Sequence, residues 1–360
     1  MAGILYILSI NLSFVLRLNE AYESSKDSVR LHRVLVSTNQ LYASELARSL
    51  NNLSHQLYSL GQHSKALSPI EESITLFREL VVTDPLYHTS RLADSLQDLS
   101  LYLHHLGRYS DALPPIEESV DLYRKLFAAD PDSNTFGLAT VLNNLSIRLS
   151  DDGRYSEVLP PIEESVDLHR KLVSTNQDDY TDALANALDT LSMQLSIVGR
   201  HSDALPPIEE SVDLYRKLVE AYPIPYSPRL AMALNTLSNR LSDIGRYPEA
   251  LLPVQESVSL RRQLVATHPA AYNPGLAFSL ETLSSTLLNL GRYTEALDAS
   301  KEAVSFYRPL FTECPPPYTR PFQRTLGYVA RALDGLGRHD EASAARTEAD
   351  SLSSQDTPGP

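Results

Sequence analysis

Leucines recur along this chain at the spacing of one buried helical face. They stand eleven, eight and four residues before a glycine, as Leu96, Leu99 and Leu103 do before Gly107. These offsets follow the 3.6-residue period of a helix that buries one side. Apolar residues at compatible spacing also follow the glycine. The pattern predicts two helices in each unit, with the glycine ending the first of them.

The marker glycines are spaced by 46 residues without exception. They are Gly61, Gly107, Gly153, Gly199, Gly245, Gly291 and Gly337. The segment 110–126 recurs letter for letter at 202–218. A chain of 360 residues exceeds what one compact core usually holds. We therefore expect a repeat array, in which each unit buries its apolar face against its neighbours.

Small side chains keep the same register as the glycines. They stand seven residues before, five after and twelve after each glycine, with Val158 as the one larger residue. Small residues on both helices let the backbones approach, and leucines fill the remaining space. Three residues after most glycines comes an N-cap type, which predicts the start of the second helix. These residues are Ser64, Ser110, Ser156, Ser202, Thr294 and Asp340. Proline pairs at 114–115, 160–161 and 206–207 predict a kink or a 3₁₀ first turn in three second helices.

Both ends of the chain depart from the pattern. Residues 1–36 fit it with a linker one residue shorter, and we interpret them as a degenerate first repeat without its glycine. This interpretation explains the apolar start, which lacks the basic region of a secretion signal, although a signal segment stays an open alternative. The polar helix predicted at 341–352 suits the solvent-facing end of an array. We expect one domain of about eight repeats over 1–352, with a disordered tail at 353–360.

The order of these positions within a unit resembles the tetratricopeptide repeat (TPR), from the large apolar residue through the small-residue triplet. A proline 24 residues after five of the glycines is similar to the one that closes the family's repeat, displaced by two helical turns. These prolines are Pro85, Pro131, Pro223, Pro269 and Pro315. The extra length is assigned to a longer second helix and to a loop that often carries a tyrosine, as at Tyr180, Tyr226, Tyr272 and Tyr318.

Long repeats of this kind resemble the kinesin-light-chain-like subclass, found also in fungal and bacterial signalling arrays. The resemblance implies an all-α, TPR-type solenoid wound as a right-handed superhelix. It also implies that the first helices line a concave groove that takes a protein or peptide ligand.

Charge and composition narrow the classes of ligand. The net charge is −14 and no basic stripe occurs, which argues against nucleic acid and against an anionic membrane. Phosphate loops, zinc-protease helices and nucleophile elbows are all missing from the sequence, so we expect no enzyme, cofactor, metal or small-molecule substrate. The one cysteine, Cys314, has no nearby histidine and fits a reducing compartment, so we expect a cytoplasmic protein.

Other charged and polar residues are interpreted as structural. The Glu-Glu pairs recur with the period, as at 117–118, so they are assigned to a solvated helix face rather than to acid–base catalysis. The adjacent His104 and His105 are likewise taken as solvated. An arginine stands 17 residues after six of the glycines: Arg78, Arg124, Arg170, Arg216, Arg262 and Arg308. We expect these arginines to bridge to the neighbouring repeat; the alternative is a basic row for an acidic ligand.

The candidate binding surface is the first-helix face predicted not to pack. Ten residues before six glycines stand the side chains that we call the amide row: Asn51, Gln97, Asn143, Asp189, Asn235 and Glu281. Side-chain amides donate and accept hydrogen bonds, so such a row suits the backbone of an extended peptide. The adjoining Leu101, Ile147 and Met193 would add apolar contacts. The alternative is that these are solvated residues without a ligand.

The resemblance also implies that a carboxylate clamp should be considered. In this family the clamp consists of lysines and arginines in the groove and binds the C-terminus of a chaperone. None of the six lysines lies on a predicted first helix, and Arg48 and Arg324 are isolated at opposite ends of the array. A receptor for chaperone C-termini is therefore not expected. We expect a protein–protein interaction scaffold, the alternative being a sensor or oligomerisation module derived from a larger NTPase-type signalling protein.

Overall fold

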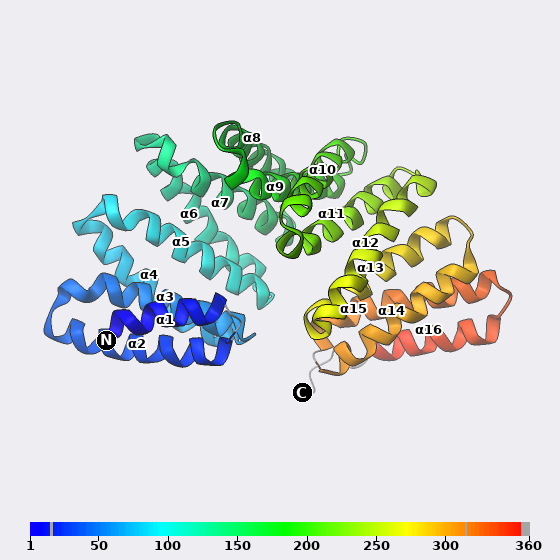
Figure 1. Cartoon of the computed structure of the whole chain (residues 1–360), viewed down its shortest axis with the longest axis horizontal. Coiled ribbons are helices and arrows are strands. Elements are labelled where there is room, and N and C mark those ends of the chain that lie inside the picture. Colours follow the sequence, from blue (N-terminus) through cyan, green and yellow to red (C-terminus); the bar gives the residue numbers. More distant parts are fainter. Residues whose placement is uncertain (15–16, 314, 354–360) are drawn as a thin grey trace. The chain divides into compact units, whose positions relative to one another are not determined.

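The computed structural model describes residues 1–14, 17–313 and 315–353. Its described residues form sixteen α-helices and two short 3₁₀ helices, and none of them lies in a strand (Figure 1). The first helices are α1 (Ala2–Phe14), α3 (Ala43–Ser59), α5 (Pro85–His105), α7 (Pro131–Asp151), α9 (Gln177–Ile197), α11 (Pro223–Asp243), α13 (Pro269–Asn289) and α15 (Pro315–Gly335). The second helices are α2 (Leu18–Thr38), α4 (His63–Thr83), α6 (Tyr109–Ala129), α8 (Leu159–Thr175), α10 (Leu205–Ala221), α12 (Tyr247–Thr267), α14 (Tyr293–Glu313) and α16 (His339–Ser353).

The chain divides into two compact units, residues 1–177 and 178–360, which are described separately. Within the first unit each helix from α1 to α8 packs against the next, and within the second α10 to α16 do the same. The predicted all-α fold of paired helices is confirmed. Continuity as one solenoid over 1–352 and its right-handed winding stay predictions. Cys314 and the tail at 354–360 lie outside the described residues.

The glycine of each unit ends the first helix as predicted. All seven marker glycines have φ between 71° and 82°, the left-handed region that a side chain disfavours. At Gly107 the amide of Arg108 bonds to the Leu103 carbonyl at 2.9 Å, and the glycine amide bonds to the His104 carbonyl at 2.8 Å. These two bonds satisfy carbonyls that the end of the helix leaves open.

The small residues do more than leave space, because their hydroxyls join the two helices of a repeat. The serine twelve residues after the glycine donates its hydroxyl to a first-helix carbonyl. These bonds, of 2.6 to 2.8 Å, run from Ser73, Ser119, Ser165, Ser211 and Ser257 to the alanines 26 residues earlier. The serine seven residues before the glycine bonds in the opposite direction. These bonds run from Ser100, Ser146, Ser192 and Ser238 to the carbonyls twelve residues later.

The predicted starts of the second helices are wrong by about two residues in most repeats. Helices α4, α6, α12, α14 and α16 begin two residues after the glycine, so that Ser110, for example, lies inside α6. The residue before α6 is Arg108, and its side chain makes no cap hydrogen bond to the helix backbone. It binds instead the Asp111 carboxylate at 2.7 Å. The acid lies in the first turn, where negative charge is favoured by the helix dipole.

The repeat-closing prolines in fact open the next first helix. Pro85 occupies the first position of α5, where its missing amide costs nothing, and the Asp84 carboxylate accepts a bond from the Tyr87 amide at 3.2 Å. The tyrosines assigned to a loop lie in the first turns of α9, α11, α13 and α15. The loop prediction is therefore wrong: most first helices, α5 among them, are 21 residues long and take up the extra length.

Of the three proline pairs, the one at 160–161 agrees with the predicted 3₁₀ turn, whereas an ordinary turn at 201–204 precedes α10. The pair at 160–161 sits at the start of α8, which follows a 3₁₀ helix at Tyr155–Glu157, and the pair at 206–207 sits at the start of α10. In the third, α6 runs as one helix through Pro114 and Pro115.

The arginines 17 residues after the glycine bind the neighbouring repeat, as predicted. Five of them reach a glutamate 40 residues later, and Arg33 of the first repeat reaches Glu72 in the same way. The pairs, at 2.6 to 2.8 Å, are Arg33–Glu72, Arg78–Glu118, Arg124–Glu164, Arg216–Glu256, Arg262–Glu302 and Arg308–Glu348. Because all are exposed, each is worth less than about 1 kcal/mol. These contacts give Glu72, Glu118 and Glu164, the second members of three Glu-Glu pairs, a structural partner.

Candidate functional site

The amide row is packed between consecutive first helices, so the prediction that this face does not pack is wrong. In the first unit Asn51 of α3 donates to the Ser95 hydroxyl of α5 at 3.0 Å and to Asp98 at 3.3 Å. Gln97 accepts a bond from Asn144 of α7 at 3.1 Å. The row residue of α7, Asn143, is buried, and its amide oxygen has no hydrogen-bond partner.

The second unit shows the same pattern. Asn235 is fully buried and donates to the Ser279 hydroxyl of the next first helix at 2.9 Å. Glu281 is also buried and binds Arg324 and, at 2.9 Å, the Tyr307 hydroxyl. The row therefore joins neighbouring repeats, because consecutive first helices lie within reach of one another's side chains.

Among the row residues, Asp189 has a carboxyl with a raised pKa. Burial raises the pKa of its carboxyl to about 6, although a hydrogen bond with Thr236 and the charge of Arg240 act in the opposite direction. The predicted apolar neighbours of the row differ in exposure: Leu101 and Ile147 are half-buried, and Met193 is exposed. A role of these residues in binding stays a proposal.

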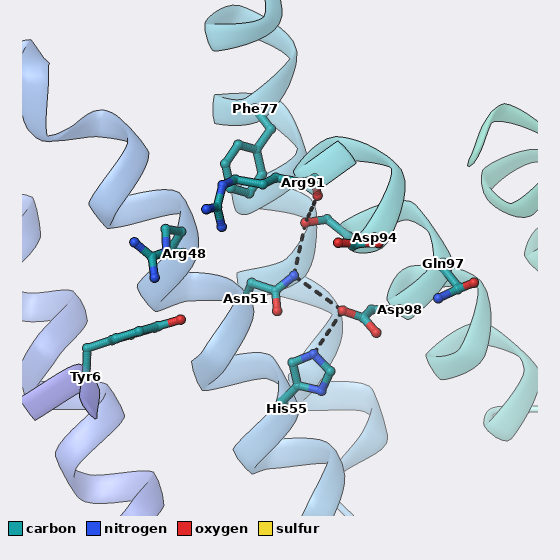
Figure 2. A pocket seen from close by; sticks show the side chains of 10 residues that line it. Tyr6, Arg48, Asn51, His55, Phe77, Arg91, Asp94, Gln97 and Asp98 are labelled. Carbon is teal, nitrogen blue, oxygen red and sulfur yellow. Dashed lines mark hydrogen bonds and ion pairs between the residues drawn. The ribbon is translucent and has the colours of Figure 1, made fainter. Parts of the chain in front are cut away.

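A pocket of about 320 Å³ opens beside Asn51 and Gln97 in the first unit. Residues of α1, α3, α4 and α5 line it, and we call it the groove pocket (Figure 2). Its lining is Tyr6, Arg48, Asn51, His55, Phe77, Arg91, Asp94, Ser95, Gln97 and Asp98. Figure 2 shows the guanidinium groups of Arg48 and Arg91 on one side and the carboxylates of Asp94 and Asp98 on the other.

The carboxylates of the pocket already have partners within the protein. Asp94 accepts a hydrogen bond from the Tyr123 hydroxyl, and Asp98 lies 2.9 Å from His55 Nε2. Burial and the charge of Asp98 raise the pKa of Asp94, against the effect of the Tyr123 bond. Burial alone would lower the pKa of His55, but the bond to Asp98 and its charge raise it overall.

The two arginines of the pocket form no ion pair with any described carboxylate. The Arg48 guanidinium lies 5.1 Å from the centre of the Tyr6 ring, and its buried Nε has no hydrogen-bond partner. Arg91 lies 4.9 Å from the centre of the Tyr87 ring and donates to the Tyr87 hydroxyl at 3.3 Å. Stacking on aromatic rings orients a guanidinium without neutralising it. Within the described residues, neither guanidinium is therefore neutralised by a direct ion pair, although the charge of Arg91 lowers the pKa of Asp94.

The interpretation of Arg48 and Arg324 as isolated is also wrong. Arg48 shares the groove pocket with Arg91, and Arg324 binds the buried Glu281. Arg48 stands 13 residues before its glycine and Arg91 stands 16 before the next, so a search by repeat position does not pair them. All six lysines lie on second helices, as predicted: Lys26, Lys65, Lys125, Lys171, Lys217 and Lys301.

The histidine pair is not merely solvated. His104 Nδ1 lies 2.9 Å from Asp151, and His105 Nε2 lies 2.8 Å from the Tyr58 hydroxyl and stacks on His63. Among the described residues, no group of three or more histidine, cysteine or acidic side chains is arranged to hold a metal ion. Among the described helices, none has both the length and the apolarity that crossing a membrane requires.

These features define an α-helical repeat protein of the TPR class. The helices are paired with a fixed period, small residues lie at the helix contacts, and polar side chains line one face of the first helices. The profile of the tetratricopeptide repeat matches residues 46–85, 92–132, 138–179, 230–270 and 277–311. The chain belongs to this family, whose fold is generally a non-enzymatic scaffold for protein interactions. No curated protein matches the sequence significantly.

Solved structures with a similar fold include BtubC (BKLC) from P. vanneervenii, at 17% identity over 69% of this chain and 92% of that one, with a TM-score of 0.55. The apo form of the quorum sensor NprR from B. thuringiensis has a TM-score of 0.62 at 11% identity, over 98% of this chain and 87% of that one. A putative kinesin light chain of Podosopora anserina with nearly identical TPR-like repeats is 14% identical over 61% and 96%, with a TM-score of 0.45. The predicted resemblance to the tetratricopeptide repeat is confirmed by the family profile.

Proposed function

We propose that this chain is a protein-interaction scaffold whose groove pocket binds a peptide segment of a partner through a carboxylate. Arg48 and Arg91 are the carboxylate-binding residues, and Asn51 and Gln97 border the path of the peptide beside them. The single observation that supports this most is the pair of guanidinium groups that line one pocket and form no direct ion pair with a described carboxylate.

Leaving these cations without a partner is unfavourable in free energy. A buried donor without a partner, such as Arg48 Nε, is destabilising by about 1–3 kcal/mol, and an incoming carboxylate would remove part of that cost. Arginine presents a planar fork that binds a carboxylate through two hydrogen bonds. Asp94 and Asp98 bond to Tyr123 and His55, and the charge of Arg91 acts on Asp94 without a direct ion pair between them. A net charge of −14 also disfavours nucleic acid as the anion.

Peptide selection tests this function and does not require the partner to be identified first. The 360-residue chain is used to select from two random peptide libraries, one that presents free C-termini and one that presents internal segments. We expect enrichment of carboxylate-bearing peptides, and the successful library tells whether a C-terminus or an acidic side chain is bound. Because charge-assisted hydrogen bonds contribute about 1.5–3 kcal/mol, Arg48→Glu with Arg91→Glu should weaken the selected peptides by about tenfold or more.

A control variant carries the same change of charge on second helices. Arg30→Glu with Lys125→Glu alters two exposed cations away from the groove pocket and should leave peptide affinity within about twofold, since exposed charges act weakly at a distance. Equal binding by the wild type and the groove variant would contradict the proposal, and so would an equal loss in both variants.

A further inference from the structure

Arg261 of α12, in the second unit, is a buried cation without an internal counter-charge. The residue is only 7% exposed, and its Nε is buried with no hydrogen-bond partner. Within the described part of the chain it forms no hydrogen bond and no ion pair. Burial lowers the pKa of its guanidinium, and no described carboxylate acts against that effect. Arginine keeps its charge in proteins, and a buried charge without a partner is strongly unfavourable.

A glycine on the next first helix makes room for this guanidinium. A Cβ added to Gly275 of α13 would lie 2.0 Å from Arg261 Nη1. The same arrangement occurs in the first unit, where a Cβ at Gly137 of α7 would lie 2.2 Å from the Tyr123 ring. Tyr123 and Arg261 both stand 16 residues after their marker glycines. A large side chain at this position therefore reaches across to the following first helix.

Other repeats place a carboxylate opposite this position. Where the residue there is tyrosine, its hydroxyl donates in two repeats to an acid on the first helix of the same repeat. These bonds run from Tyr123 to Asp94 and, at 2.9 Å, from Tyr307 to Glu281. In the repeat of Arg261 the residues that correspond to these two acids are Met232 and Asn235. The carboxylate is therefore missing in the repeat where a cation would need it most.

The surroundings of Arg261 correspond to the groove pocket of the first unit. Met232, Arg261, Gly275 and Phe278 stand four periods of 46 residues after four residues that line that pocket. Those four are Arg48, Phe77, Arg91 and Asp94. The exposed residues differ in character, because Met232 is 53% exposed and Phe278 37% where the groove pocket has an arginine and an aspartate. The position in the second unit thus combines one buried cation with two exposed apolar side chains.

We propose that Arg261, Met232 and Phe278 form a second ligand site, independent of the groove pocket, for a peptide carboxylate flanked by apolar groups. The planar guanidinium matches a carboxylate through two hydrogen bonds, and such a bond is strengthened by burial. A phosphate group carries three strong acceptor oxygens, and neither Met232 nor Phe278 has a donor for them. The incoming carboxylate takes the place that Asp94 and Glu281 occupy in their own repeats.

Methyl NMR of the 360-residue chain tests this site, because the sequence has only three methionines, Met1, Met193 and Met232. The chain, labelled with ¹³C at the methionine methyl groups, is titrated with N-acetylphenylalanine, which carries a carboxylate beside an aromatic ring. We expect a saturable shift of the Met232 signal at millimolar concentrations and an unchanged Met1 signal. N-acetylphenylalaninamide lacks the charge and should bind at least about tenfold more weakly. An equal response to the amide or to inorganic phosphate would overturn the proposal, and so would an unchanged Met232 signal.

Matched variants assign the response to Arg261. Arg261→Leu and Arg261→Gln should both lose it while the helical circular dichroism is kept. Arg262→Leu, which removes the exposed neighbour that binds Glu302, should retain it. Arg48→Glu with Arg91→Glu should also retain it, so a failure of the groove pocket and a failure of this site are told apart. A response that persists in both Arg261 variants, or that is lost equally in Arg262→Leu, would contradict the assignment.

Discussion

Replacing Ser119 by leucine is expected to lower the free energy of unfolding by about 3 kcal/mol. Ser119 is fully buried between the helices of one repeat, and its hydroxyl donates to the Ala93 carbonyl at 2.8 Å. A leucine has no room there, because close approach of the two backbones is what the small residue permits. It would push the helices apart and remove the bond between them.

Two further variants separate the loss of space from the loss of the hydrogen bond. Ser119→Ala keeps the volume small and removes only the bond, so about 1 kcal/mol should be lost. Asp121→Ala, at an exposed position of the same helix, should change stability by less than about 0.5 kcal/mol. Urea unfolding followed by circular dichroism measures all three. Leucine tolerated as well as alanine would mean that the helices are not in close contact at this position.

The decrease of the free energy of unfolding at acidic pH is expected to depend strongly on His169 of α8. The side chain is buried, its Nδ1 has no hydrogen-bond partner, and burial lowers the pKa to about 4 from the ordinary 6.5. The unfolded chain therefore binds a proton here more readily than the folded chain between pH 6.5 and 4. Stability is present in full above pH 6.5 and falls as the pH is lowered through this window, by up to about 3 kcal/mol.

His169→Phe should remove this dependence, since Phe77 occupies the equivalent position of an earlier repeat. The free energies of unfolding of the variant and the wild type should be similar at pH 7. At pH 4 the free energy of unfolding of the variant should exceed that of the wild type by about 2–3 kcal/mol. His268→Phe, at an exposed position, should produce no such gain. Unfolding curves at a series of pH values provide the measurement, and parallel pH profiles for His169→Phe and the wild type would contradict it.

The periodic part of the fold could be predicted from the sequence, because a residue that packs in the same way in every repeat also recurs at the same position of every repeat. A position such as Ser119 must be small in every repeat, so its role is visible from its recurrence. The arginine ladder was found in the same way, since Arg124 and Glu164 each keep their place relative to a glycine. Helix starts were missed because Arg108 is not an N-cap type, and its contact with Asp111 is of a kind that capping rules do not include.

The candidate site was less predictable, because binding residues do not need to follow the period. Arg48 and Arg91 stand at different positions of their repeats and meet only because α3 and α5 lie side by side. The amide row was found from its recurrence, but recurrence alone cannot tell a ligand-binding residue from one that joins repeats. Asn235, fully buried and bonded to Ser279, belongs to the second kind.

Hydrogen–deuterium exchange of the full chain, with and without a peptide selected on it, tests the groove pocket most directly. We expect the peptide to slow exchange in α3 and α5, around Arg48 and Arg91, and to leave the amides near Arg30 and Lys125 unchanged. Slowed exchange confined to the second helices, or an unchanged α3 and α5 at saturating peptide, would contradict a binding site on the first-helix face.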